Sequence, residues 1–248
     1  MPTRPFAASL IGKAIREVDP GAERARRRVE LRIIRRLEEV LAETRVQVLR
    51  RVKREGLTLL DNAAFWAAQD ALLYRVLLSG IEDGAMLGTS VGTAVIGELG
   101  IGVDWALVNQ DAAEWARRYA GDLIRGISRT TRSATRTAIS NWIESGEPLD
   151  ELSRRLTPTF GRTRAEMIAS TEVTRAYAEG NERAARDSGL DIVPARRKPP
   201  AHPRCRCFAS LERSKRPELE GKFVWVWNTV LDERVCAICG PLNGQEMV

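Results

Sequence analysis

The sequence predicts a mainly α-helical protein, with an elongated or bundled helical body followed by a small Cys-rich α+β module. Apolar residues recur at three- and four-residue steps up to about residue 188, and the composition changes abruptly after Gly189. With 248 residues, 44% of them hydrophobic, the chain can bury one large core or two modest ones. We expect three regions: a basic N-terminal helical arm (1–60), a helical body (61–188) and the Cys-rich module (189–248).

The arm is predicted to be one long helix. It begins at Asp19 and Pro20, which fit an N-cap and a first-turn proline, and it ends at Gly56. Its apolar residues share one face: Ile33, Leu37, Val40, Leu41, Val48 and Val52. The opposite face is densely basic and supplies five candidate DNA contacts: Arg26, Arg27, Arg28, Arg35 and Arg36. The alternative is a solvated face whose arginines are partly paired with glutamates.

The body is predicted to contain several helices. One begins at Asp61 and ends before Gly80, and another covers residues 104–145, with Gly121 and Gly126 as points where it divides. After a short helix that opens at a proline, a last helix ends at a glycine. For the start of that last helix, Thr163 and Glu166 fit a capping box, and its stop is Gly189.

Three glycines of the body fall four residues apart, at Gly84, Gly88 and Gly92. On a helix they would form a smooth stripe, where another backbone can approach closely. Each glycine costs a helix about 1 kcal/mol relative to alanine. A membrane-helix dimer motif is the sharper alternative, but acidic residues bracket too short a segment for it.

Beyond Gly189 the chain is rich in Pro and Arg and cannot continue a helix, because proline removes amide donors and forces its predecessor toward extended geometry. The run FVWVWNTV alternates as a strand does, and LDERVCAICGPLNGQ is typical of a turn-bounded Cys knuckle. The module therefore has little core of its own, and a bound metal would stabilise its fold.

Five residues of the module are candidate metal ligands: His202, Cys205, Cys207, Cys236 and Cys239. The C-x-x-C pair at Cys236 and Cys239 has the spacing by which two thiolates grip a tetrahedral metal, usually zinc. The H-P-R-C-R-C string is less regular, but His202 with either neighbouring Cys completes a site. Structural zinc, reduced unliganded thiols and a regulated disulfide all stay open.

The net charge of +6 and the isoelectric point near 9.5 favour contact with a polyanion or an acidic protein surface. No phosphate-binding loop occurs, and a single His cannot be both general base and metal ligand, so we expect no enzyme. The first residues lack a signal peptide's apolar core, and no run is long enough to span a bilayer. We therefore expect a protein made in a reducing cytoplasm.

Three strings together resemble a known family: RTRAEMIASTEVTRAYAEGN, PPAHPRCRC and VWNTVLDERVCAICGPLNGQ. They are similar to the signature blocks of the phage Mu F-like minor head protein, or phage head morphogenesis, family, and the resemblance covers roughly residues 100–248. It implies a virion component in the head interior or near the portal, assembled in the host cytoplasm. The implied partners are the portal protein, the major capsid protein and packaged double-stranded DNA, and the protein would be oligomeric in the particle.

One departure from the family concerns the order of the blocks. In the family the W-N-T…C-x-x-C-G block precedes the H-P-x-C-R-C block, whereas here the order is reversed. Either the parts still meet in space, because metal ligands need proximity and not a fixed order, or the site never forms. The alternative function is a zinc-stabilised DNA-binding or nuclease-like protein.

Overall fold

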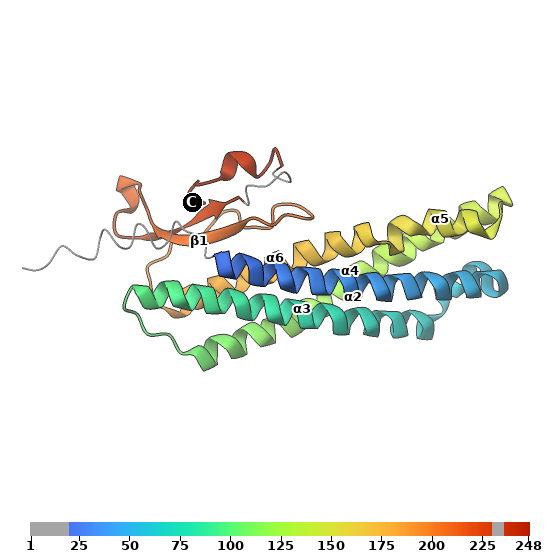
Figure 1. Cartoon of the computed structure of the whole chain (residues 1–248), viewed down its shortest axis with the longest axis horizontal. Helices are drawn as coiled ribbons and strands as arrows, with labels where there is room; N and C mark the ends of the chain where they lie inside the picture. Colours follow the sequence, from blue (N-terminus) through green and yellow to red (C-terminus); the bar gives the residue numbers. More distant parts are fainter. Residues whose placement is uncertain (1–19, 230–235) are drawn as a thin grey trace, which may run out of the picture.

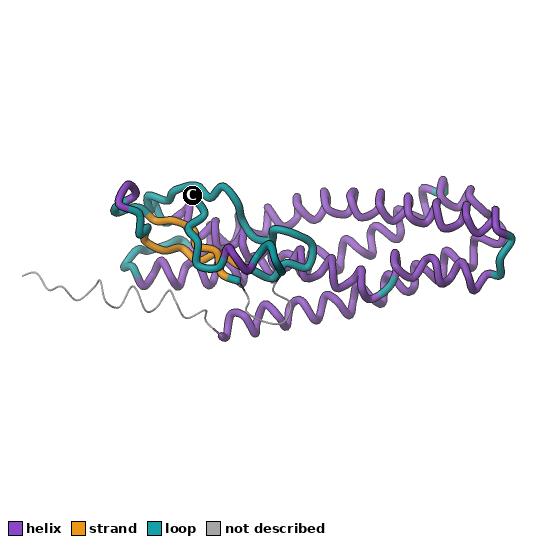
Figure 2. Tube along the Cα trace, turned by 90° about the horizontal axis from the view of Figure 1, so that it is seen from above, coloured by secondary structure: helices purple, strands orange, loops and turns teal. Residues whose placement is uncertain are grey.

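The computed structural model describes residues 20–229 and 236–248, and it confirms the predicted fold class. Long helices run side by side in an elongated bundle, and a small β-hairpin lies over one end of it (Figures 1 and 2). The bundle consists of α2 (Pro20–Glu55), α3 (Ala63–Glu98), α4 (Trp105–Ser145), α5 (Leu149–Phe160) and α6 (Arg162–Asp187). A 3-10 turn, η1 (Gly56–Asp61), joins α2 to α3.

Helix α2 is part of the bundle and not a separate arm. Its predicted apolar face is buried, with Leu37 and Val48 completely inaccessible, and it packs against α3, α5 and α6. One continuous core joins these residues to Trp66 of α3 and Phe160 of α5. The boundary expected at residue 60 is therefore a turn within one body, because neither side buries its apolar face alone.

Helix α3 continues past Gly80, where the sequence predicted an end. The side chain of Asn62 caps its start by accepting a hydrogen bond from the N–H of Phe65, at 3.0 Å. The glycine stripe lies against α6, so the close approach of another backbone that the spacing predicted is confirmed. A Cβ at Gly88 would overlap the carbonyl oxygen of Tyr177, and one at Gly180 would overlap that of Ala85. The packing gained by this close approach offsets the helix cost of the glycines.

Helix α4 is continuous from Trp105 to Ser145, so the predicted division at Gly121 and Gly126 is wrong. Among the described residues, no atom outside the helix lies within 4 Å of a Cβ built at either glycine. The N-cap of the helix is Asp104, whose side chain accepts hydrogen bonds from two backbone amides, and its C-cap is Gly146 in the left-handed conformation.

Helix α6 begins without the predicted capping box. Its N-cap is Gly161, and no side chain in the described part of the chain caps it. Glu166 accepts a hydrogen bond from Arg162 at 3.0 Å instead of reaching back to the N-cap. The helix ends at Asp187, and Gly189 follows with φ +71°, so the predicted stop is confirmed.

The C-terminal module is built on an antiparallel hairpin of β1 (Phe208–Arg213) and β2 (Phe223–Asn228), with short 3-10 turns η2 (Pro217–Leu219) and η3 (Gly240–Leu242). The predicted strand is thus confirmed as β2. The other edge of β2 forms hydrogen bonds with residues near the C-terminal end of the sequence. The N–H of Met247, for example, donates to the carbonyl of Trp225 at 2.8 Å. A second core combines both tryptophans of the module with Ile96 of α3 and Val108 of α4, so the module borrows apolar surface from the bundle.

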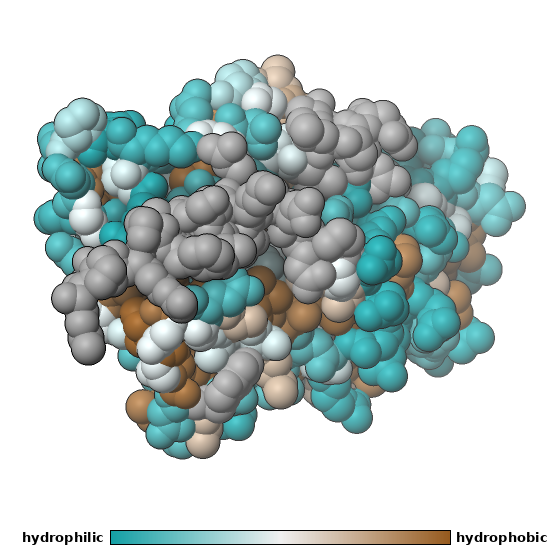
Figure 3. Space-filling view, turned by 60° about the vertical axis from the view of Figure 1, so that its left-hand side comes forward, coloured by the Kyte–Doolittle hydropathy of each residue, from teal (hydrophilic) through white to brown (hydrophobic). Residues whose placement is uncertain are grey.

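The surface at the module end is mostly hydrophilic, and apolar side chains show as smaller patches (Figure 3). Among residues 20–229 and 236–248, no helix combines the length and apolarity that a bilayer crossing requires.

Candidate functional site

The hairpin brings the five predicted metal ligands to one end of the module. His202, Cys205 and Cys207 precede β1, whereas Cys236 and Cys239 follow β2. Because the strands are antiparallel, Phe208 at the start of β1 is opposite Asn228 at the end of β2. The segments before β1 and after β2 therefore meet, although they are far apart in the sequence.

Two turns of similar shape present the ligands. In His202-x-x-Cys205, the N–H of Cys205 donates to the carbonyl of His202 at 3.1 Å; in Cys236-x-x-Cys239, the N–H of Cys239 donates to the carbonyl of Cys236 at 3.2 Å. Arg204 takes the left-handed conformation, with φ +65°, which closes the first turn. The second turn places the sulfurs of Cys236 and Cys239 within 4.8 Å of each other, as in a zinc knuckle.

The donor atoms form two triads that share Cys239. His202 Nε2 lies 3.0 Å from Cys236 Sγ and 3.2 Å from Cys239 Sγ, and Cys205 Sγ lies 3.8 Å from Cys239 Sγ. The second triad consists of Cys205, Cys207 and Cys239. In a tetrahedral zinc site, bond lengths of about 2.3 Å to sulfur and 2.0 Å to nitrogen separate two sulfurs by about 3.8 Å and sulfur from nitrogen by about 3.5 Å. The cluster could therefore hold a metal ion.

The thiols influence each other's protonation. Hydrogen bonding from the Cys207 thiol lowers the pKa of Cys205 to about 5, and the same contact raises the pKa of Cys207 above its usual range. Burial raises the pKa of Cys239 to about 12. Without a metal the cluster thus keeps protons on part of its thiols, and a metal ion would release them on binding.

Helix α6 positions the first turn. The backbone N–H of Arg204 donates to the hydroxyl of Thr171 at 2.9 Å, and the guanidinium of Arg204 donates to the carbonyl of Thr163 at 3.0 Å. Further along α6, the amide of Asn181 donates to the carbonyl of Ala209 in β1 at 3.1 Å. The three blocks singled out in the sequence meet here, so the reversed order of the two Cys blocks does not keep them apart. No sequence pattern pointed to Thr171 or Arg204 in this role.

The five arginines singled out on α2 do not share one environment. Arg26 is only 6% exposed; its guanidinium donates to the carbonyl of Arg206 at 2.8 Å and lies over the rings of Tyr177 and Phe208. Burial lowers its pKa. Its predicted place on an exposed DNA-binding face is therefore wrong, because the helix turns this residue toward the module.

The other four arginines differ in their pairing. Arg27 forms a 2.6 Å ion pair with Glu30. Arg28, Arg35 and Arg36 are exposed, and within the part of the chain that the structure describes they form no ion pair. These three remain as a basic strip on the outer face of α2.

Ion pairs form at helical spacing within α6, between Arg162 and Glu166 and between Arg175 and Glu172. Glu172 accepts hydrogen bonds from Arg175 at 2.8 Å and from the hydroxyl of Tyr119 on α4 at 2.5 Å. Burial raises the pKa of Glu172. This cluster ties α6 to α4.

Comparison with known proteins identifies no relative: no family model matches the chain, and no curated protein or solved structure is significantly similar to it. The resemblance to the phage Mu F-like minor head proteins thus depends on the three sequence blocks.

Proposed function

We propose that this chain is a minor structural protein of a tailed-phage head, whose Cys/His cluster binds a structural zinc ion that fixes the module on the bundle. One observation supports the proposal: the described parts of the three blocks that resemble the head morphogenesis family meet around the cluster. In that role the bundle docks to the portal or the major capsid protein. Fold-level analogy alone would be a weaker argument.

The two similar turns favour His202, Cys205, Cys236 and Cys239 as the zinc ligands, with Cys207 as a neighbour outside the set. Three thiolates and one imidazole suit zinc better than the oxygen-preferring cations. The second ring nitrogen, Nδ1, lies 2.8 Å from the carbonyl of Pro203, which fixes the orientation of the ring. A site closed by four protein ligands supplies folding free energy and leaves no open position for a substrate.

The basic strip of α2 favours a second contact, with packaged DNA. Arg28, Arg35 and Arg36 have no ion-pair partner among the described residues, so phosphates would pair with them without breaking an internal contact. The same strip supports the alternative of a zinc-stabilised DNA-binding or nuclease-like protein. Against a nuclease, His202 is held by the cluster and is not placed as a free general base.

Two measurements test the proposed function. Protein purified without chelator is expected to contain one zinc per chain by elemental analysis, and chelation is expected to lower its melting temperature; protein without stoichiometric zinc would refute the metal site. The protein is also expected to co-sediment with portal rings or proheads at low salt. A folded protein that stays in the supernatant would contradict the assembly role.

A plasmid cleavage assay distinguishes the proposed structural role from the nuclease alternative. Incubation with Mg²⁺ or Zn²⁺ is expected to leave supercoiled DNA intact. Robust cleavage that disappears in His202→Ala would favour the nuclease.

A further inference from the structure

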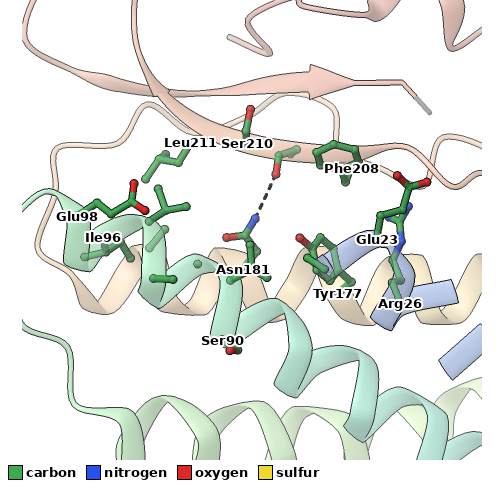
Figure 4. Close-up of a pocket in the computed structure, with 17 residues that line it drawn as sticks. Glu23, Arg26, Ser90, Ile96, Glu98, Tyr177, Asn181, Phe208, Ser210 and Leu211 are labelled. Carbon is green, nitrogen blue, oxygen red and sulfur yellow. Dashed lines mark hydrogen bonds between the residues drawn. The ribbon is translucent and has the colours of Figure 1, made fainter. Parts of the chain in front are cut away.

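A cavity of about 340 Å³ lies between the hairpin and the helices, outside the Cys/His cluster. Residues 208–211 of β1 line one side, α3 lines another through Val95, and α6 lines a third through Tyr177 and Asn181 (Figure 4). Arg26 of α2 lies at the end where Tyr177 and Phe208 meet. The volume of the cavity and its lining, which is apolar with a few polar groups, are those of a small binding site.

The free edge of β1 faces this cavity. On the far edge of β2 the carbonyl of Trp225 binds the N–H of Met247, so the backbone groups of Trp225 point away from β1. Leu211 is opposite Trp225 in the register, and in such a pair both residues turn their backbone groups outward. Ala209 has the same orientation, and its carbonyl accepts the hydrogen bond from Asn181 on α6.

Two buried groups at the cavity lack partners. Leu211 is 5% exposed, yet outside the hairpin no described residue forms a hydrogen bond with its backbone. In the described chain, Nη1 of Arg26 likewise has no hydrogen-bond partner. Each buried polar group without a partner costs about 1–3 kcal/mol. The backbone N–H of Leu211 and Nη1 of Arg26 therefore point to a ligand that supplies oxygen acceptors. The carbonyl of Leu211 points to a ligand that also supplies a donor.

We propose that this cavity binds an extended apolar peptide segment of a partner protein, which pairs with the edge of β1 and places a backbone carbonyl on Arg26. A peptide strand supplies both acceptors and donors along its backbone, and its alternate side chains fill the apolar lining. Glu23 and Glu30 already stabilise the charge of Arg26, which favours a neutral carbonyl over a carboxylate. This inference adds to the proposed function the chemistry of a partner, which is an extended apolar peptide segment. The peptide test below does not depend on the proposed function.

The probe is a capped peptide, acetyl-Val-Thr-Val-Thr-Val-amide, titrated into the isotope-labelled full chain. Binding is expected to shift the backbone amide signals of Ala209 and Leu211 and to slow hydrogen exchange at Leu211. The same peptide methylated at alternate backbone nitrogens keeps its side chains but cannot donate to the strand edge, and we expect at least tenfold weaker binding. A free C-terminal carboxylate is expected to bring no gain; a tenfold gain would overturn the assignment of a neutral carbonyl.

Two tryptophan variants on α3 test the location. Val95→Trp fills the cavity and is expected to weaken peptide binding at least tenfold, whereas Met86→Trp, at an exposed position of the same helix, leaves it unchanged. Melting curves of both variants report whether they are folded. Equal affinity for the plain and methylated peptides would show that binding does not use the edge of β1, and no shift at Ala209 and Leu211 with millimolar peptide would show that the cavity binds no peptide; either result would overturn the proposal.

Sedimentation separates this site from the proposed function. If folded Val95→Trp loses the peptide but still sediments with proheads, the cavity is not the docking site for the head, and the assembly role stands. If the wild type binds the peptide but never sediments with proheads, the peptide site stands, and the assembly role is contradicted.

Discussion

The backbone N–H of Arg204 donates a 2.9 Å hydrogen bond to the hydroxyl of Thr171, and this contact joins the His202–Cys205 turn to α6. Arg204 is in the left-handed conformation, so the hydrogen bond fixes a turn that an isolated peptide would seldom adopt. The geometry of the candidate metal ligands thus depends on a helix that supplies none of them.

Thr171→Val is expected to destabilise the protein by about 1 kcal/mol, because the amide of Arg204 loses its acceptor. Zinc affinity is expected to fall as well, since the first turn is held less firmly. Thr137→Val serves as the control, because the hydroxyl of Thr137 donates to the carbonyl of Ser133 within its own helix. Urea unfolding and a competitive zinc titration measure the two effects; equal values for both variants would contradict the positioning role.

Cys205→Ser is expected to abolish stoichiometric zinc binding, whereas Cys207→Ser is expected to retain one zinc per chain. The reason is that Cys205 pairs with His202 in a turn shaped like that of Cys236 and Cys239, and Cys207 lies outside both turns. Elemental analysis of the two variants decides between them. The reverse result would place Cys207 in the ligand set.

Gly88→Ala and Gly180→Ala are each expected to destabilise the protein by about 3 kcal/mol, since the new methyl group would overlap a carbonyl of the facing helix. Gly126→Ala is the matched control, because a methyl group there has open space. It is expected to stabilise the protein by up to about 1 kcal/mol through helix propensity. Thermal unfolding of the three variants measures this contrast, and similar melting temperatures would disprove the close approach of α3 and α6.

The stability contributed by Glu172 is expected to depend on pH. Burial raises its pKa in the folded state, so the folded protein binds a proton more readily than the unfolded chain does. The stability that Glu172 contributes is therefore fully present below the ordinary pKa of a Glu side chain. It is lost as the pH rises through the raised pKa of the folded state. The difference in unfolding free energy between wild type and Glu172→Gln should increase as the pH falls from 7 toward the ordinary value; a flat difference would contradict the shift.

Replacing Arg28, Arg35 and Arg36 by Gln is expected to weaken binding to duplex DNA and to reduce the salt dependence by a slope of about 0.9 for each lost phosphate contact. The control replaces three arginines that form ion pairs within their own helices: Arg125, Arg154 and Arg186. Fluorescence anisotropy over a range of salt concentrations measures both sets. Equal losses would show that only net charge matters.

Much of the bundle could be predicted because a buried helix face imprints a regular apolar spacing on the sequence. Leu37 and Val48 of α2 follow that spacing, and both are buried. The glycine stripe of α3 was also predictable as a place of close approach. Its partner was not, because Gly180 lies about ninety residues away in the chain and nothing local links the two.

The candidate site was predictable in its residues and not in its arrangement. The spacing of Cys236 and Cys239 identifies a knuckle, but the antiparallel pairing of β1 with β2 brings the second turn to it. Arg26 was misplaced because charge alone suggests exposure. Two aromatic rings and a backbone carbonyl offset the free-energy cost of burying the charge of Arg26, and those partners come from distant parts of the chain.

The glycines that let α3 and α6 pack closely also determine how the molecule responds to a mechanical force. Helices whose backbones are this close cannot rotate or slide past each other without collision, and α4, with 41 residues, extends about 60 Å beside them. A push along α3 would therefore move α6 with it, and β1, which α6 holds through the hydrogen bond from Asn181 to Ala209, would follow.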